Sequence, residues 1–124
     1  MIIDSDILIN ASHGQSSAVD FLIQSGNSET LYITVISHLE LIAGARDKTE
    51  LRRVEKFLSR FVLITLDDAS SRRAVDLMRQ YKLSHGMALP DALIAAAALE
   101  RGETLATSNT RDFIFIKGLK LATP

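Results

Sequence analysis

The most constraining feature of the sequence is an alternation of short apolar runs with longer stretches of helical periodicity. The apolar runs have the length of single buried strands, and the stretches between them repeat apolar side chains every three or four residues, as one face of a helix requires. Parallel strands need crossovers of this kind. The pattern predicts an α/β sandwich with a short, mainly parallel sheet. We expect strands at 2–3, 31–35, 61–66 and 104–107, and helices at 15–24, 49–60, 69–82 and 91–100. Gly26 is expected to end the helix at 15–24, and Gly102 is expected to be the C-cap of the helix at 91–100.

Composition narrows the class of protein. The 124 residues suit one domain, so we expect a single domain over 1–124. With 14 Lys and Arg against 15 Asp and Glu, the net charge is −1, which excludes a bulk nucleic-acid coat and requires any phosphate contact to use a local basic patch. The absence of cysteine excludes disulfides and thiol catalysis. No apolar run approaches the length of about 20 residues that spans a bilayer, so we expect a cytoplasmic protein without a membrane partner.

Acidic and amide side chains follow the predicted strands or begin a predicted helix. In open parallel sheets, ligands bind beyond the carboxyl ends of the strands, so these side chains are candidates for one site. Glu40 joins them because it lies three residues after Ser37, the spacing of a capping box at a helix start. The other candidates are Asp4, Asp6, Asp91, Asn109 and Asp112.

Each candidate also has a purely structural interpretation. Asp4 and Asp91 stand where helix caps are common, and Glu40 is a natural capping partner for Ser37. Asn109 suits a turn, because Asn tolerates left-handed backbone. The combination is more informative than any single residue.

Several carboxylates at one concave edge repel one another unless a cation lies among them. Oxygen ligands select hard divalent ions, so Mg²⁺ or Mn²⁺ is expected. Such an ion stabilises charge that develops on a phosphate, and hydrolysis of a phosphodiester is the reaction that this set serves best.

The zinc-protease, serine-hydrolase and P-loop motifs are absent, and His38 is expected at the surface. The basic residues between 46 and 60 are expected on a solvated helix face, from which some steer a phosphate backbone toward the acidic edge.

Four segments resemble, in order, the motifs of PIN-domain ribonucleases and, within them, of VapC-type toxins from toxin–antitoxin pairs. The resemblance extends from residue 2 to about residue 119, nearly the whole chain. The segments are IIDSDILI at 2–9, SHLELIAG at 37–44, PDALIAA at 90–96 and TSNTRDF at 107–113.

The resemblance implies a three-layer α/β/α fold and a Mg²⁺- or Mn²⁺-dependent endoribonuclease that acts on RNA as a toxin. It also implies a homodimer and a VapB-like antitoxin whose tail blocks the groove. By the same resemblance, Asp4, Glu40 and Asp91 form the acidic core that holds the metal. Asn109 stands where some members have Asp, and Asp112 offers a carboxylate through water. Ser5, Asp6, Ser37 and Thr107 are expected to support these groups.

Two alternatives remain open from the sequence. One is a non-catalytic PIN-like binding module, in which Asn109 marks lost metal affinity. The other is a haloacid-dehalogenase-like phosphatase, because Asp4-Ser5-Asp6 resembles the D-x-D start of that superfamily, with Asp4 as nucleophile and Asp6 as acid/base. That superfamily has a longer chain with a later acidic pair, and Asp67-Asp68 is the only adjacent pair here.

Overall fold

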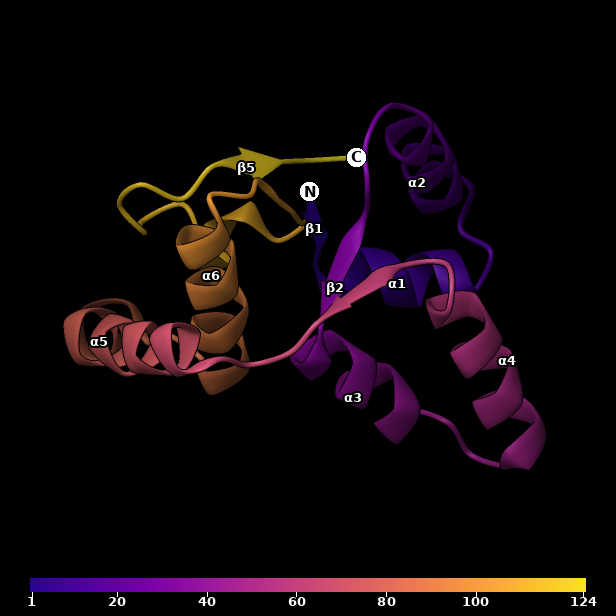
Figure 1. The fold of residues 1–124 in the computed structure, drawn as a ribbon, viewed down its shortest axis with the longest axis horizontal. Coiled ribbons are helices and arrows are strands. Elements are labelled where there is room, and N and C mark those ends of the chain that lie inside the picture. Colours follow the sequence, from indigo (N-terminus) through magenta and orange to yellow (C-terminus); the bar gives the residue numbers. More distant parts are fainter.

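The computed structural model describes residues 1–124 and contains a five-stranded parallel sheet between helices (Figure 1). The strand order is β3-β2-β1-β4-β5, and every neighbouring pair is parallel. The strands are β1 (Ile2–Ile3), β2 (Tyr32–Thr34), β3 (Val62–Ile64), β4 (Leu105–Ala106) and β5 (Leu121–Ala122).

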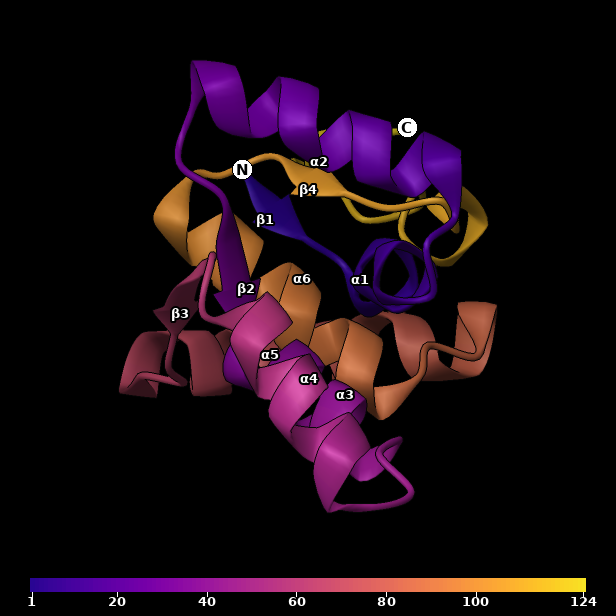
Figure 2. The same cartoon turned by 90° about the vertical axis from the view of Figure 1, so that its right-hand side faces the viewer.

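Helices cover both faces of this sheet and create three layers. One core packs β1 and β4 side chains against α5 and α6, and the second packs the opposite side chains of β1, β2 and β4 against α1 to α4. Figures 1 and 2 show this division, with α5 and α6 on one side of the strands and α1 and α2 on the other. The helices are α1 (Ser5–Ser12), α2 (Ser16–Ser28), α3 (Val35–Ala43), α4 (Lys48–Leu58), α5 (Asp68–His85) and α6 (Leu89–Arg101). A short 3₁₀ helix, η1 (Thr110–Asp112), follows β4.

The α6 helix lies in the core of the molecule, and most of its buried side chains are alanines. Its buried positions include four consecutive alanines, 95–98, whose small side chains let the helix approach both the sheet and α5. Gly102 ends α6 with a φ of 66°, a left-handed conformation that side chains other than glycine rarely adopt. This confirms the predicted C-cap. None of the helices is both long and apolar enough to cross a membrane.

The order of the strands reverses next to β1, and this reversal determines where a site can form. The chain passes from β1 to β2 and β3 in one direction, then returns to place β4 and β5 on the other side. The carboxyl ends of β1 and β4 therefore flank a topological switch point, where open α/β sheets bind ligands. The backbone N–H of Asp4 donates to the carbonyl of Ala106 at 2.9 Å, which holds the two strand ends together.

The predicted three-layer α/β fold is confirmed, with differences at particular elements. The α1 helix and β5 were not predicted, and α2 continues to Ser28 instead of ending before Gly26. A further prediction, that Ser37 caps a helix with Glu40 in its first turn, is wrong. Thr34 is the N-cap and its hydroxyl accepts from the Ser37 N–H at 3.2 Å, so α3 begins three residues earlier.

Candidate active site

Asp4 lies at the switch point with both carboxylate oxygens engaged. It is the N-cap of α1, and its Oδ1 accepts from the Ser5 N–H at 2.8 Å, so the cap interpretation is correct for this residue. Its Oδ2 accepts from the Thr107 hydroxyl, also at 2.8 Å, across the gap between β1 and β4. The side chain therefore does more than cap a helix, because it joins the ends of two strands.

Burial disfavours the ionised form of Asp4. The residue is only 6% exposed, and burial is the main reason that its pKa rises to about 7. Repulsion from Asp6 and Asp91 adds to this increase, while the hydrogen bonds from Thr107 and Ser5 oppose it without cancelling it. A cation near Asp4 would therefore stabilise the ionised form of its carboxyl group.

The loop after β4 is fastened to the start of α1. The Thr107 hydroxyl, which donates to Asp4, also accepts from the Asn109 N–H at 3.0 Å. Asp6 accepts from the Ser108 N–H at 2.8 Å through Oδ2, and its Oδ1 accepts from the Ile7 N–H. Asp6 thus joins the loop after β4 to the start of α1, and its role as a supporting residue of the site stays a prediction.

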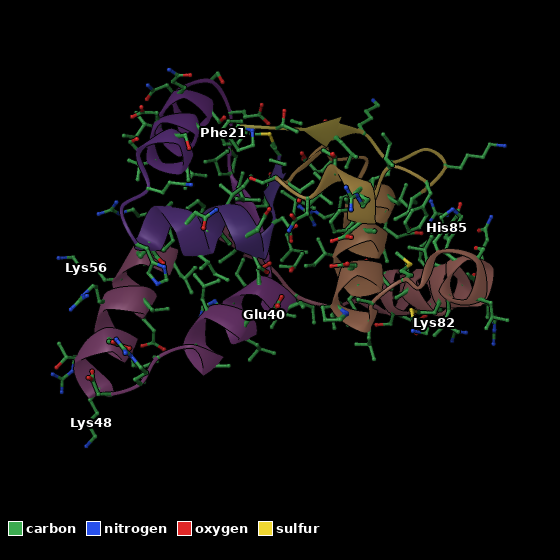
Figure 3. The ribbon with its side chains drawn as sticks, turned by 180° about the vertical axis from the view of Figure 1, so that it is seen from behind. Phe21, Glu40, Lys48, Lys56, Lys82 and His85 are labelled. Atoms are coloured by element: carbon green, nitrogen blue, oxygen red, sulfur yellow. The ribbon has the colours of Figure 1, made fainter.

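Glu40 reaches the same edge from α3. Its Oε1 is 2.8 Å from the Ser5 hydroxyl, which is also 2.8 Å from the hydroxyl of buried Ser37. A hydroxyl carries one proton, so Ser5 donates to the Glu40 carboxylate and accepts from Ser37. Glu40 itself is exposed and lies where α3 passes α1 and α6 (Figure 3). The Ser5–Ser37 pair is therefore a buried support for an exposed carboxylate.

Asp91 is the acidic group with the fewest restraints. It is half-buried in the first turn of α6, and its carboxylate forms no hydrogen bond or ion pair. The N-cap of α6 is Ala88, so the interpretation of Asp91 as a cap is wrong. Burial raises the pKa of Asp91 to about 6, and repulsion from Asp112, Glu40 and Asp6 adds to the shift. A charged group without a partner at this position is available to a ligand.

Asn109 and Asp112 border the cluster from η1. Asn109 is exposed and is the N-cap of η1, with a φ of −100°, so the left-handed turn interpretation is wrong. Asp112 is exposed and lines a pocket of about 320 Å³ together with Asp91. Asp112 therefore adds negative charge next to Asp91, while Asn109 adds none.

These charges repel one another across the carboxyl edge of the sheet. Repulsion couples Asp91 to Asp112, Glu40 and Asp6, and couples Asp4 to Asp6 and Asp91. No three acidic or histidine side chains are close enough together to hold one ion in the arrangement shown. The carboxylate of Asp91 forms no hydrogen bond that fixes its orientation. Oxygen donors with raised pKa values fit a hard divalent cation.

Some features of this region were not predicted from the sequence. The pocket beside Asp91 also includes His85, Arg111 and Phe115, and no spacing signal connects the turn after α5 to η1. His38 is half-buried, with its Nδ1 covered and unpartnered, so its predicted surface position is wrong. A larger cavity of about 810 Å³ between α2 and α4 is lined by none of the predicted site residues.

The fold and the site together define an α/β protein with an acidic cluster at the switch point of a parallel sheet. The PIN domain family model matches residues 1–118. Ribonuclease VapC10 of Mycobacterium tuberculosis is 38% identical over 121 residues, which cover 97% of this chain and 90% of the relative. The chain belongs to the PIN-domain family, which the resemblance of its four motifs had predicted.

Solved structures agree with this assignment. A toxin–antitoxin complex from Klebsiella pneumoniae contains a chain with a TM-score of 0.83 and 32% identity, covering 99% of this chain and 96% of that one. A chain of VapBC2 from Rickettsia felis, bound to a promoter DNA fragment, has a TM-score of 0.85 at 24% identity and shows the shared fold, with 99% and 97% coverage. The phosphatase alternative is not retained, because both the family and the fold are those of PIN domains.

Proposed function

We propose that the chain is a divalent-metal-dependent endoribonuclease and the toxin of a VapBC-like pair in the cytoplasm. The observation that carries the proposal is the meeting of two acids with raised pKa values, Asp4 and Asp91, at the switch point of the sheet. The name of the relative, Ribonuclease VapC10, supports RNA as the substrate.

Asp4, Glu40 and Asp91 are the proposed holders of Mg²⁺ or Mn²⁺. The donor set fits such an ion because it is composed of oxygens only, and because a cation would favour the charged forms of Asp4 and Asp91, which their burial disfavours. Asn109 and Asp112 are proposed to complete the site, Asn109 by its amide oxygen and Asp112 through water. The chemistry that an ion held by these residues would supply is a lower pKa for a water molecule and neutralisation of negative charge on the phosphate.

The protein's own contribution is to hold the ligands and to orient them. Thr107 fixes Oδ2 of Asp4, and Ser5, supported by Ser37, fixes Glu40. Asp6 keeps the loop after β4 against α1. Asp91 is free to turn toward a cation at the site, since its carboxylate has no competing hydrogen bond.

The proposed partner is a VapB-like antitoxin, and the proposed assembly is a homodimer. The structural relative from Klebsiella pneumoniae is described as a toxin–antitoxin complex, which supports a protein partner for this chain. A basic side chain on the antitoxin would complement the unpaired charge of Asp91. Light scattering on the chain alone tests the homodimer, and light scattering on the chain mixed with a candidate VapB-like protein tests the complex.

The function is tested by incubating the purified chain with a structured RNA in Mg²⁺, in Mn²⁺ and in EDTA. We expect internal cleavage with either ion and none in EDTA. Asp91→Asn should abolish cleavage, while the control Asp20→Asn, which removes the same charge from an exposed position on α2, should not. Equal cleavage with and without EDTA, or none with either ion, would contradict the proposal. Calorimetric binding of Mg²⁺ without cleavage would also contradict it, and no binding at millimolar ion would favour the non-catalytic binding module.

A further inference from the structure

The pocket beside Asp91 has an aromatic wall as well as an acidic one. Its volume of about 320 Å³ is at the lower end of the range for small-ligand sites. Asp91 and Asp112 form the acidic wall, and His85 and Phe115 face them from the end of α5 and the segment after η1. Because Asp91 belongs to both the pocket and the proposed metal site, a molecule in the pocket lies directly next to the reaction.

His85 is held in place more firmly than an exposed side chain usually is. It is the last residue of α5 (Figure 3), and its ring stacks on Phe115 with centroids 4.2 Å apart and planes 20° apart. Tyr81 contacts the same ring edge-on at 5.7 Å, and the Ser84 hydroxyl lies 2.7 Å from Nδ1. The result is an exposed, pre-oriented aromatic surface. A solvated histidine at a helix end needs none of these contacts.

Arg111 gives the pocket a positive charge. It lies in η1 between Asn109 and Asp112, is exposed, and takes part in none of the ion pairs of the chain. A guanidinium group binds phosphate oxygens in a bidentate manner. An unpaired arginine next to a flat aromatic surface is the combination with which proteins bind single-stranded RNA, by phosphate contact and base stacking.

We propose that this pocket binds the nucleoside next to the scissile phosphate of RNA, with the base stacked on the exposed ring of His85, which Phe115 supports from its other face, and a backbone phosphate at Arg111. The inference rests on the proposed ribonuclease function and adds a substrate subsite to it. Asp112 faces the base from the acidic wall and accepts hydrogen bonds from it, so the pocket contributes to the choice of cleavage site.

The first test is an NMR titration of the isotope-labelled chain in EDTA, with AMP and with ribose 5-phosphate as probes. AMP should shift the ring signals of His85 and Phe115 in a saturable way, and ribose 5-phosphate, which has no base, should not. His85→Ala should weaken AMP binding about 5-fold or more, and His85→Phe should restore it, because a base stack contributes at least about 1 kcal/mol. Arg111→Ala should weaken both probes. Thermal melts would show that each variant remains folded.

Two matched variants serve as controls, since His13→Ala and Arg72→Ala remove the same side chains from exposed positions elsewhere, Arg72 having only a surface ion pair with Asp68. Both should bind AMP as the unmodified chain does. Ring signals that do not respond to AMP, or a His85→Ala variant that binds AMP normally, would overturn the proposal.

The second test maps cleavage positions in a long RNA. His85→Ala should raise KM and redistribute the cleavage positions while cleavage remains dependent on Mg²⁺. Unchanged positions and KM would overturn a role in substrate choice. If the unmodified chain cleaves no RNA, the proposed ribonuclease function fails, and the AMP titration alone decides whether the pocket binds a nucleotide.

Discussion

Replacing Asp4 by Asn should make the protein more stable relative to the unmodified chain as the pH rises. The cause is the buried carboxyl group, whose pKa increases from 3.8 to about 7 on folding. Because the folded-state pKa is the higher one, the stabilising contribution of the neutral acid is fully present below about pH 4 and is lost as the pH rises through about 7. Asn keeps the shape and an oxygen for the Ser5 N–H, but it carries no charge.

The magnitude follows from the size of the shift. About three pKa units correspond to about 4 kcal/mol in the free energy of unfolding. The difference between Asp4→Asn and the unmodified chain should therefore grow by up to about 4 kcal/mol between pH 4 and pH 8. This is a large fraction of the roughly 5–15 kcal/mol that stabilises a typical domain. Any constant effect of the altered hydrogen bond to Thr107 cancels in the comparison across pH.

Urea unfolding followed by circular dichroism, in EDTA at several pH values, measures this difference. Asp20→Asn serves as the control because Asp20 is exposed, and its effect should stay within about 0.5 kcal/mol. The difference in the free energy of unfolding could instead stay constant with pH, or favour the unmodified chain as the pH rises. Either result would refute the idea that burial disfavours the ionised form of Asp4.

Three further predictions concern the groups that hold the site. Thr107→Val removes the hydroxyl that donates to Asp4, so it should lower RNA cleavage. It should also lower the free energy of unfolding in urea by about 1–3 kcal/mol. Unchanged cleavage would count against Thr107 as a positioning residue. Ser5→Ala releases Glu40 and should lower kcat more than it raises KM in steady-state assays, and a pure KM effect would contradict this role. Gly102→Ala should destabilise the chain by about 1 kcal/mol without changing cleavage, because φ is 66° there, and an equally stable variant would disprove that reason.

The layered fold was predictable because it depends on periodicity that the sequence displays over long stretches. The α5 segment repeats its apolar positions over several turns, and the α6 segment is rich in alanine and leucine and precedes Gly102; both helices were predicted within a few residues. The α1 segment was not, because Ile7, Leu8 and Ile9 form a short continuous apolar run that does not separate helix from strand. The β5 strand has two residues and pairs only with β4, so tertiary contact defines it.

The position of Asp4, Asp6 and Asn109 at one edge of the sheet could be predicted because these residues follow β1 and β4, which are neighbouring strands. The connections between them could not. The Ser5 link between Ser37 and Glu40 joins positions more than 30 residues apart, and no local pattern encodes it. The error at Ser37 has a similar source. Ser-x-x-Glu and Thr-x-x-Ser overlap in this segment, and the position at which β2 ends made Thr34 the cap.

The electrostatics of the site link stability, metal binding and inhibition. Burial makes the ionised forms of Asp4 and Asp91 less stable, which is why their pKa values are raised. A cation that binds beside them offsets part of this loss of stability. The proposed metal ion and a basic antitoxin side chain would act on the same charges and would therefore compete. A ligand that binds only the folded state stabilises it by RT ln(1 + [L]/Kd). Mg²⁺ should consequently stabilise the free toxin more than the complex, because in the complex the antitoxin has already offset the charge.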